Sequence, residues 1–235
     1  MRNSLTSHIA CLALGAVAML AVLPRVGAQT GAADVSAPDK WPRDVDRKSG
    51  MRLPIPDRES LDDAGKKAFD RASTPGASIA GLQGPGGVQL YLPKIAAPMN
   101  TINRFLRYEA GFTGRQREIA ILITAREMDS QFEWVAHEQV ALKEGVPPAV
   151  IDIIKHRKPL AGVEEGDAII IEIGRELWRD HKVKPETFAR ANAHFGSAKL
   201  IELGTLMGNY AATAALLTLV DMQLHAGARP LLPLP

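Results

Sequence analysis

Apolar residues recur every three or four positions through most of the chain after residue 113, which is the spacing of an amphipathic α-helix. From Phe132 to Ala141 the apolar positions fall on one helical face, and Gly145 is a typical helix stop. The same spacing predicts later helices over residues 165–180, 185–195 and 197–223. Because no segment alternates apolar and polar positions as a half-buried strand does, we predict an all-α domain.

Residues that favour helix ends lie at the boundaries of these segments. Thr113 and Gln116 have the spacing of a capping box, which satisfies free backbone N–H groups at the start of a helix. Asp129 or Ser130 is expected to cap the following helix. Further helix starts are predicted at Pro147, Pro148, Pro185 and Ser197.

The chain before residue 99 is rich in proline, glycine and polar residues, which weaken the helical pattern. We predict a flexible segment over residues 29–50 and an extended stretch over residues 52–60. A short helix over residues 61–72 is then followed by a long irregular N-terminal arm over residues 73–98 and a second helix over residues 100–111. A loop as long as the predicted arm is usually functional or part of an interface.

The first 28 residues have the pattern of a secretory signal peptide. Arg2 supplies a positive start, residues 9–23 are almost entirely apolar, and Pro24 ends the run. The run is shorter than the roughly 20 residues of a membrane span, and small residues precede a cleavage point after Ala28. We predict cleavage, a periplasmic or secreted protein, and no stable membrane insertion afterwards. An uncleaved N-terminal anchor is the alternative.

The amino-acid composition argues against thiol chemistry and against nucleic-acid binding. Cys11 is the only cysteine, and it lies inside the apolar run, whereas a lipidated cysteine would follow that run. Removal of the leader therefore leaves a chain without disulfides or thiolate nucleophiles. The net charge is only +2 and no block of Lys or Arg stands out, which argues against a nucleic-acid partner.

Two glutamates and one histidine are the candidates for a catalytic site. Glu133 and His137 are four residues apart, so they project from one face of a predicted helix. Glu118 lies on the preceding helix, behind Arg115 and Arg117, and faces the pair if the two helices form a hairpin. A carboxylate beside an imidazole can act as a general acid/base unit. A solvated Glu–His pair on a helix surface is the alternative.

Residue chemistry also bears on a possible metal site and on the role of His194. Glu118, Glu133 and His137 include ligand types that suit several divalent metals, but such a set selects no metal by itself, so we predict no metal site. His194 precedes the last helix, where it is either a structural histidine at a helix end or a residue that approaches the site.

Two stretches carry a resemblance to a known family. They are GRQREIAILITAREMDSQFEWVAHEQVALKEGVPPAVI, at residues 114–151, and HFGSAKLIELGTLMGNYAATAALLTLV, at residues 194–220. Both resemble the carboxymuconolactone decarboxylase and alkylhydroperoxidase D-type family, and the likeness covers roughly residues 52–226. It implies an alkylhydroperoxidase D-like helical domain, which we place at residues 51–228 before a tail at 229–235. It also implies a homo-oligomer, often a trimer or hexamer.

The resemblance also implies which chemistry to expect. The peroxidase-like branch carries two cysteines upstream of the histidine, and this chain has Ser130 and Glu133 there, so peroxide reduction by the family's thiol route is excluded. The chain instead resembles the decarboxylase-like branch, which uses no cofactor. That branch implies His137 as general acid/base, Glu133 as the group that orients it, and Glu118 as a second acid/base or a hydrogen-bond partner of the substrate. Substrate-binding roles are implied for Arg115 or Arg117, Trp134 and His194.

These inferences lead to one predicted function and two alternatives. We predict an exported, cofactor-free lyase or related acid/base enzyme that acts on a small lactone or carbonyl compound. A non-catalytic oligomeric binding protein of the same fold is the first alternative, and a peroxidase is the second. Export is the feature that fits a catabolic decarboxylase least well, because such an enzyme works where its substrate is made.

Overall fold

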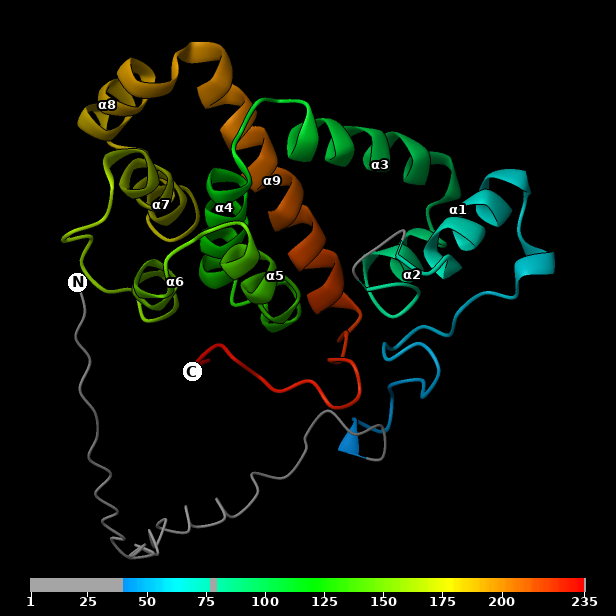
Figure 1. The fold of residues 1–235 in the computed structure, drawn as a ribbon. Coiled ribbons are helices and arrows are strands. Elements are labelled where there is room, and N and C mark those ends of the chain that lie inside the picture. The colour runs from blue at the N-terminus through cyan, green and yellow to red at the C-terminus, as the bar shows by residue number, and fades with distance from the viewer. Residues whose placement is uncertain (1–39, 77–79, 235) are drawn as a thin grey trace, which may run out of the picture. The chain divides into compact units, whose positions relative to one another are not determined.

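The computed structural model describes residues 40–76 and 80–234. The predicted signal peptide, Cys11 and residues 29–39 lie outside the described residues. The described part of the chain contains helices and no strand, as the sequence predicts (Figure 1). The helices are η2 (Arg58–Ser60), α1 (Asp63–Ser73), α2 (Pro85–Gln89), α3 (Pro93–Tyr108), α4 (Gly114–Glu127), α5 (Gln131–Lys143), α6 (Pro148–Lys155), α7 (Glu165–Trp178), α8 (Pro185–Phe195) and α9 (Ser197–Leu219).

Helix α4 lies at the centre of the core, in contact with α5, α6, α7 and α9. Every residue from Ile119 to Ile123 is inaccessible to solvent, because this stretch of α4 is apolar on all its faces. The same helix carries Arg117 and Glu118, which are also buried. Buried charges need partners, so the central position of α4 forces these two side chains into defined interactions.

The helix starts confirm most of the sequence prediction. The capping box at Thr113 and Gln116 is present, with both of its hydrogen bonds. Ser130 occupies the cap position of α5, but its side chain makes no capping hydrogen bond. The predicted cap at Ser197 is wrong, because Gly196 is the cap of α9 and the Ser197 hydroxyl donates to Asn192 instead.

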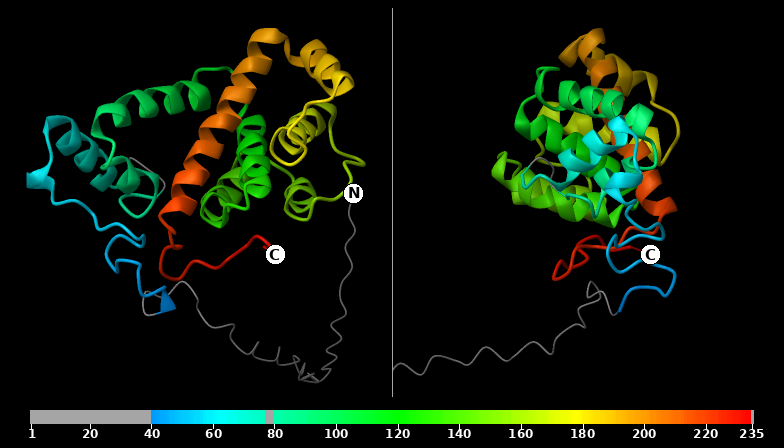
Figure 2. Two further views of the ribbon diagram at one scale, coloured as in Figure 1. Left: turned by 180° about the vertical axis from the view of Figure 1, so that it is seen from behind. Right: turned by 90° about the vertical axis from the view of Figure 1, so that its right-hand side faces the viewer.

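The predicted irregular arm over residues 73–98 contains helical structure. Helices α2 and α3 begin at Pro85 and Pro93, where a missing N–H costs nothing because the first turn has no partner for it. Helix α3 continues through Pro98, which the sequence suggested would precede the helix. Figures 1 and 2 show α1, α2 and α3 together on one side of α9, with α4 and α5 on its other side.

The flexible segment predicted over residues 29–50 does not extend to residue 50. Trp41 and Val45 are buried, and the Gly50 carbonyl accepts a hydrogen bond from the backbone N–H of Gln223. This part of the chain therefore packs beside the end of α9. The C-terminal tail is also held, because the Gln131 side chain bonds to the backbone of residues 231 and 232.

Helix α9 is long and apolar enough to cross a membrane by length and composition alone. It is also a core helix of the described unit, where it contacts α2, α3, α4, α5 and α8. Its buried residues include Leu203, Leu206 and Met207, which are completely inaccessible. Packing within this chain therefore accounts for the buried apolar face of α9, whereas Ile201 and Leu219 on the same helix are exposed.

Candidate functional site

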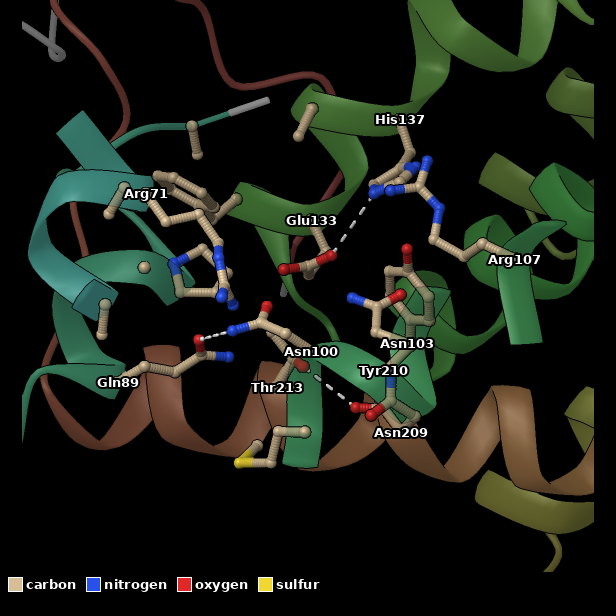
Figure 3. Close-up of a pocket in the computed structure, with 18 residues that line it drawn as sticks. Arg71, Gln89, Asn100, Asn103, Arg107, Glu133, His137, Asn209, Tyr210 and Thr213 are labelled. Atoms are coloured by element: carbon tan, nitrogen blue, oxygen red, sulfur yellow. Dashed lines mark hydrogen bonds and ion pairs between the residues drawn. The ribbon is translucent and has the colours of Figure 1, made fainter. Parts of the chain in front are cut away.

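A cavity of about 180 Å³ lies between helices α1, α2 and α3 on one side and α5 and α9 on the other. Its volume falls below the ~300 Å³ at which drug-sized sites begin, so it suits a small compound. Figure 3 shows its polar side chains. They are Arg71, Gln89, Asn100, Asn103, Arg107, Glu133, His137, Asn209, Tyr210 and Thr213.

His137 is held by a carboxylate from another helix. Its Nδ1 lies 2.7 Å from Oε2 of Glu118, on α4, while its Nε2 lies 3.7 Å from Oε2 of Glu133, one turn earlier on α5. All three residues are at least 96% buried, and Glu133 and His137 still line the cavity. The sequence prediction assigned the orienting role to Glu133. The structure gives that role to Glu118, because only Glu118 is within hydrogen-bond distance.

Glu118 is kept ionised by its neighbours. Burial raises its pKa, but the contact with His137 and the nearby guanidinium groups outweigh burial and hold the pKa below its usual value. Arg117 Nε donates to Oε1 at 3.1 Å, and Arg107 Nη2 lies 3.8 Å from the same oxygen. An ionised carboxylate only accepts hydrogen bonds, so Nδ1 of His137 must be the donor. In the neutral ring, Nε2 is then the unprotonated nitrogen.

The pKa of the Glu133 carboxyl is shifted in the opposite direction from that of Glu118. Burial raises its pKa above the ordinary value, and the positive groups nearby do not offset this. Its carboxyl is therefore easier to protonate than that of Glu118. The site thus combines one carboxylate that stays charged with one carboxyl that can carry a proton, an arrangement found where acid and base roles are divided.

Tyr210 completes the wall of the cavity next to His137. Its ring meets the imidazole edge-on, with 5.3 Å between centroids and an angle of 87°. Burial raises the pKa of Tyr210, so the phenol stays protonated and can donate a hydrogen bond. Among the described residues, Nε of Arg107 and Oδ1 of Asn103 are buried without a hydrogen-bond partner. Both belong to side chains that line the same cavity.

The two arginines predicted to bind substrate do not line the cavity. Arg115 points to α7, where its Nε donates to Asp167 at 2.7 Å. Arg117 is buried and donates to Glu118, to Glu144 and to the Arg107 carbonyl. Arg117 therefore supports the site through Glu118, and Arg115 belongs to the packing of α4 against α7.

Trp134 and His194 also lie away from the cavity. Trp134 is completely buried in the core, and its Nε1 donates to Glu138. His194 is exposed at the end of α8, with its ring against that of Phe195 at 4.6 Å between centroids. Their predicted roles in the site are therefore wrong as direct contacts to a ligand in this cavity.

Sequence reasoning missed Arg71, Asn103 and Arg107. A signal for part of this group was present, because Asn100, Asn103 and Arg107 are spaced three and four residues apart and so share one face of α3. No group of three or more His, Cys, Asp or Glu residues in the described chain is arranged to hold a metal ion. Glu118 in particular is already committed to His137 and Arg117.

Comparison with known proteins identifies the fold. No protein-family model and no curated protein matches the chain. Among solved structures, the chain is similar to the crystal structure of an alkylhydroperoxidase AhpD core, an uncharacterised peroxidase-related protein from Ralstonia eutropha JMP134. The two share 14% sequence identity and a TM-score of 0.59, over 75% of this chain and 93% of the other. The predicted all-α, AhpD-like fold is therefore confirmed.

Proposed function

We propose that this protein is an acid/base enzyme of the carboxymuconolactone decarboxylase-like type, which acts on a small lactone or carbonyl compound. One observation carries the proposal. A buried, ionised Glu118 holds Nδ1 of His137, and this leaves Nε2 beside Glu133 in a cavity of suitable size. The paired groups of opposite protonation tendency favour proton transfer over simple binding.

His137, Glu133 and Tyr210 each have a role in the proposed reaction. Nε2 of His137 removes a proton from a carbon next to a carbonyl group, or takes a proton from the Glu133 carboxyl and delivers it to such a carbon after a bond to that carbon has broken. Loss of carbon dioxide from a carboxy lactone or a β-keto acid is a reaction of this kind. Glu133 therefore accepts a proton when Nε2 has acted as a base, and supplies the proton when carbon dioxide leaves. The Tyr210 hydroxyl donates a hydrogen bond to the oxygen on which negative charge develops. No cofactor is required for these steps.

Two other functions are supported less well. A binding protein that had lost catalysis would be expected to expose the Glu133–His137 pair or to fill the cavity, and neither is the case. The peroxidase-related name of the AhpD-core structure suggests redox chemistry for that protein. Here the only cysteine is Cys11, inside the predicted signal peptide, and Ser130 and Glu133 occupy the two positions where the peroxidase-like branch has its cysteines. The predicted signal peptide would make the site of action periplasmic or extracellular.

The test is turnover of a panel of lactones and β-keto acids by the full mature protein. We expect His137→Ala to lower kcat/KM by at least about 100-fold on any substrate found, the usual contribution of a general acid/base. His156→Ala is the matched control, because His156 also pairs with a carboxylate four residues away, Asp152, but on the exposed surface of α6. Equal activity of the two variants would exclude the proposal.

A further inference from the structure

The cavity contains more positive than negative charge. Arg71, from α1, and Arg107, from α3, both line it, and Figure 3 shows them on opposite sides with Glu133 between them. Glu133 is the only carboxyl group among the described lining residues, and its burial favours the uncharged form. The two guanidinium groups are therefore not neutralised from within the cavity.

Both arginines have hydrogen-bond donors to spare. Within residues 40–76 and 80–234, the Arg71 guanidinium makes no ion pair and no hydrogen bond. Nε of Arg107 is buried without a partner, and its closest ion-pair contact, with Glu118, is long at 3.8 Å. Arg117 provides the contrast, since three acceptors satisfy its guanidinium. A guanidinium has five N–H donors, so Arg71 and Arg107 are available to an added acceptor.

A second groove with a positive lining adjoins the cavity. A groove of about 450 Å³ along α3 is lined by Arg71, Arg104 and Arg107, and it shares Asn100 and Asn103 with the cavity. A concave surface with charges of one sign concentrates ions of the opposite sign and speeds their arrival. The groove is therefore a suitable approach for an anion to the inner cavity.

We propose that Arg71 and Arg107 are the residues that select the ligand of this cavity, with the carboxylate of a small organic acid held by Arg71 and the remainder of the molecule between Arg107 and His137. The planar guanidinium fork matches a carboxylate in two parallel hydrogen bonds. This inference rests on the proposed function, because it assigns the residues that contact the substrate in the same site. It also moves substrate recognition from Arg115 and Arg117 to residues that the sequence did not single out.

The experiment measures binding, so it needs no substrate. Malonate and succinate are titrated into the full mature protein by calorimetry, with malonamide and succinamide as uncharged partners of the same shape. Arg71→Gln removes the anion contact. Lys67→Gln is the matched control, because it removes one positive charge from an exposed position on the same helix, outside the cavity. Both sites are exposed, so neither variant is expected to unfold the protein.

We expect at least one dicarboxylate to bind at least about tenfold more tightly than its diamide, and Arg71→Gln to weaken it at least about tenfold while Lys67→Gln leaves it unchanged. Equal binding of acid and amide, equal affinity in the two variants, or no binding at millimolar concentration would overturn the inference. Displacement by inorganic phosphate at equal affinity would overturn the assignment to an organic carboxylate. Carboxylate binding that persists in a protein without turnover would instead count against the proposed function alone.

Discussion

Oε2 of Glu118 lies 2.7 Å from Nδ1 of His137, although the two residues are 19 positions apart and on different helices. The contact exists because α4 is buried on all sides and α5 packs directly against it. A carboxylate at that depth is stable only with partners, and His137, Arg117 and Arg107 provide them. The fold and the proposed chemistry therefore depend on the same buried carboxylate, that of Glu118.

The first prediction concerns stability. Glu118→Ala leaves Nε of Arg117 and Nδ1 of His137 buried without their acceptor, and it should lower the free energy of unfolding by about 3–5 kcal/mol. Glu144→Ala removes the other carboxylate bound to Arg117, but Glu144 is 40% exposed, so it should cost no more than about 1 kcal/mol. Urea unfolding of both variants measures the difference. Similar losses would show that burial of Glu118 is not what matters.

The second prediction concerns Glu133 and pH. Burial raises the folded-state pKa of Glu133, so the folded protein binds this proton more tightly than the unfolded chain does. The ionised carboxyl therefore costs stability at neutral and higher pH, and this cost disappears as pH falls toward the ordinary value of 4.5. Glu133→Gln should raise Tm by a few degrees at pH 8 and by little at pH 4.5, while it lowers turnover.

Melting curves across this pH range, with Glu144→Gln as a carboxylate control on the surface, provide the measurement. A lower Tm of Glu133→Gln at pH 8 would contradict the raised pKa of Glu133. An effect of Glu133→Gln on Tm that does not change with pH would contradict it as well.

The third prediction concerns Tyr210. Tyr210→Phe keeps the ring that meets His137 edge-on but removes the hydroxyl donor. We expect kcat to fall by roughly 10- to 100-fold, as for a lost transition-state hydrogen bond, with little change in KM. Steady-state kinetics on the substrate found in the panel tests this. A change confined to KM would assign Tyr210 to binding instead.

The fourth prediction concerns the start of α4, which positions Glu118. Thr113→Ala removes a capping-box hydrogen bond and should cost about 1 kcal/mol of unfolding free energy. Ser197→Ala at the start of α9 should cost less, because Gly196 rather than Ser197 is the cap there. Equal losses in thermal unfolding would argue against the observed caps.

The fold after residue 113 was predictable because apolar spacing and caps agree there. Before that point, Pro85 and Pro93 suggested irregular structure, although each is compatible with the first turn of a helix. Spacing on α3 could have shown the shared face of Asn103 and Arg107, but not that α1 brings Arg71 to the same cavity. Contacts between distant helices follow from tertiary packing, which a local pattern does not encode.

The error over Arg115 and Arg117 has a geometric cause. Residues two apart on a helix point in nearly opposite directions, so Arg115 reaches Asp167 on α7 while Arg117 reaches Glu144 at the end of α5. Neither direction leads into the cavity. The proximity of Glu118, Glu133 and His137 was predictable because they lie on consecutive helices that pack as a hairpin. The homo-oligomer and export stay predictions.

The proposed role of His137 depends most on the proton at Nδ1, which leaves Nε2 for proton transfer. Long-range ¹H–¹⁵N NMR of the imidazole, at a pH where the same spectrum shows the ring to be neutral, observes this directly. We predict a protonated Nδ1 and an unprotonated Nε2, with a loss of this preference in Glu118→Gln. A proton on Nε2 in the unaltered protein would contradict the account.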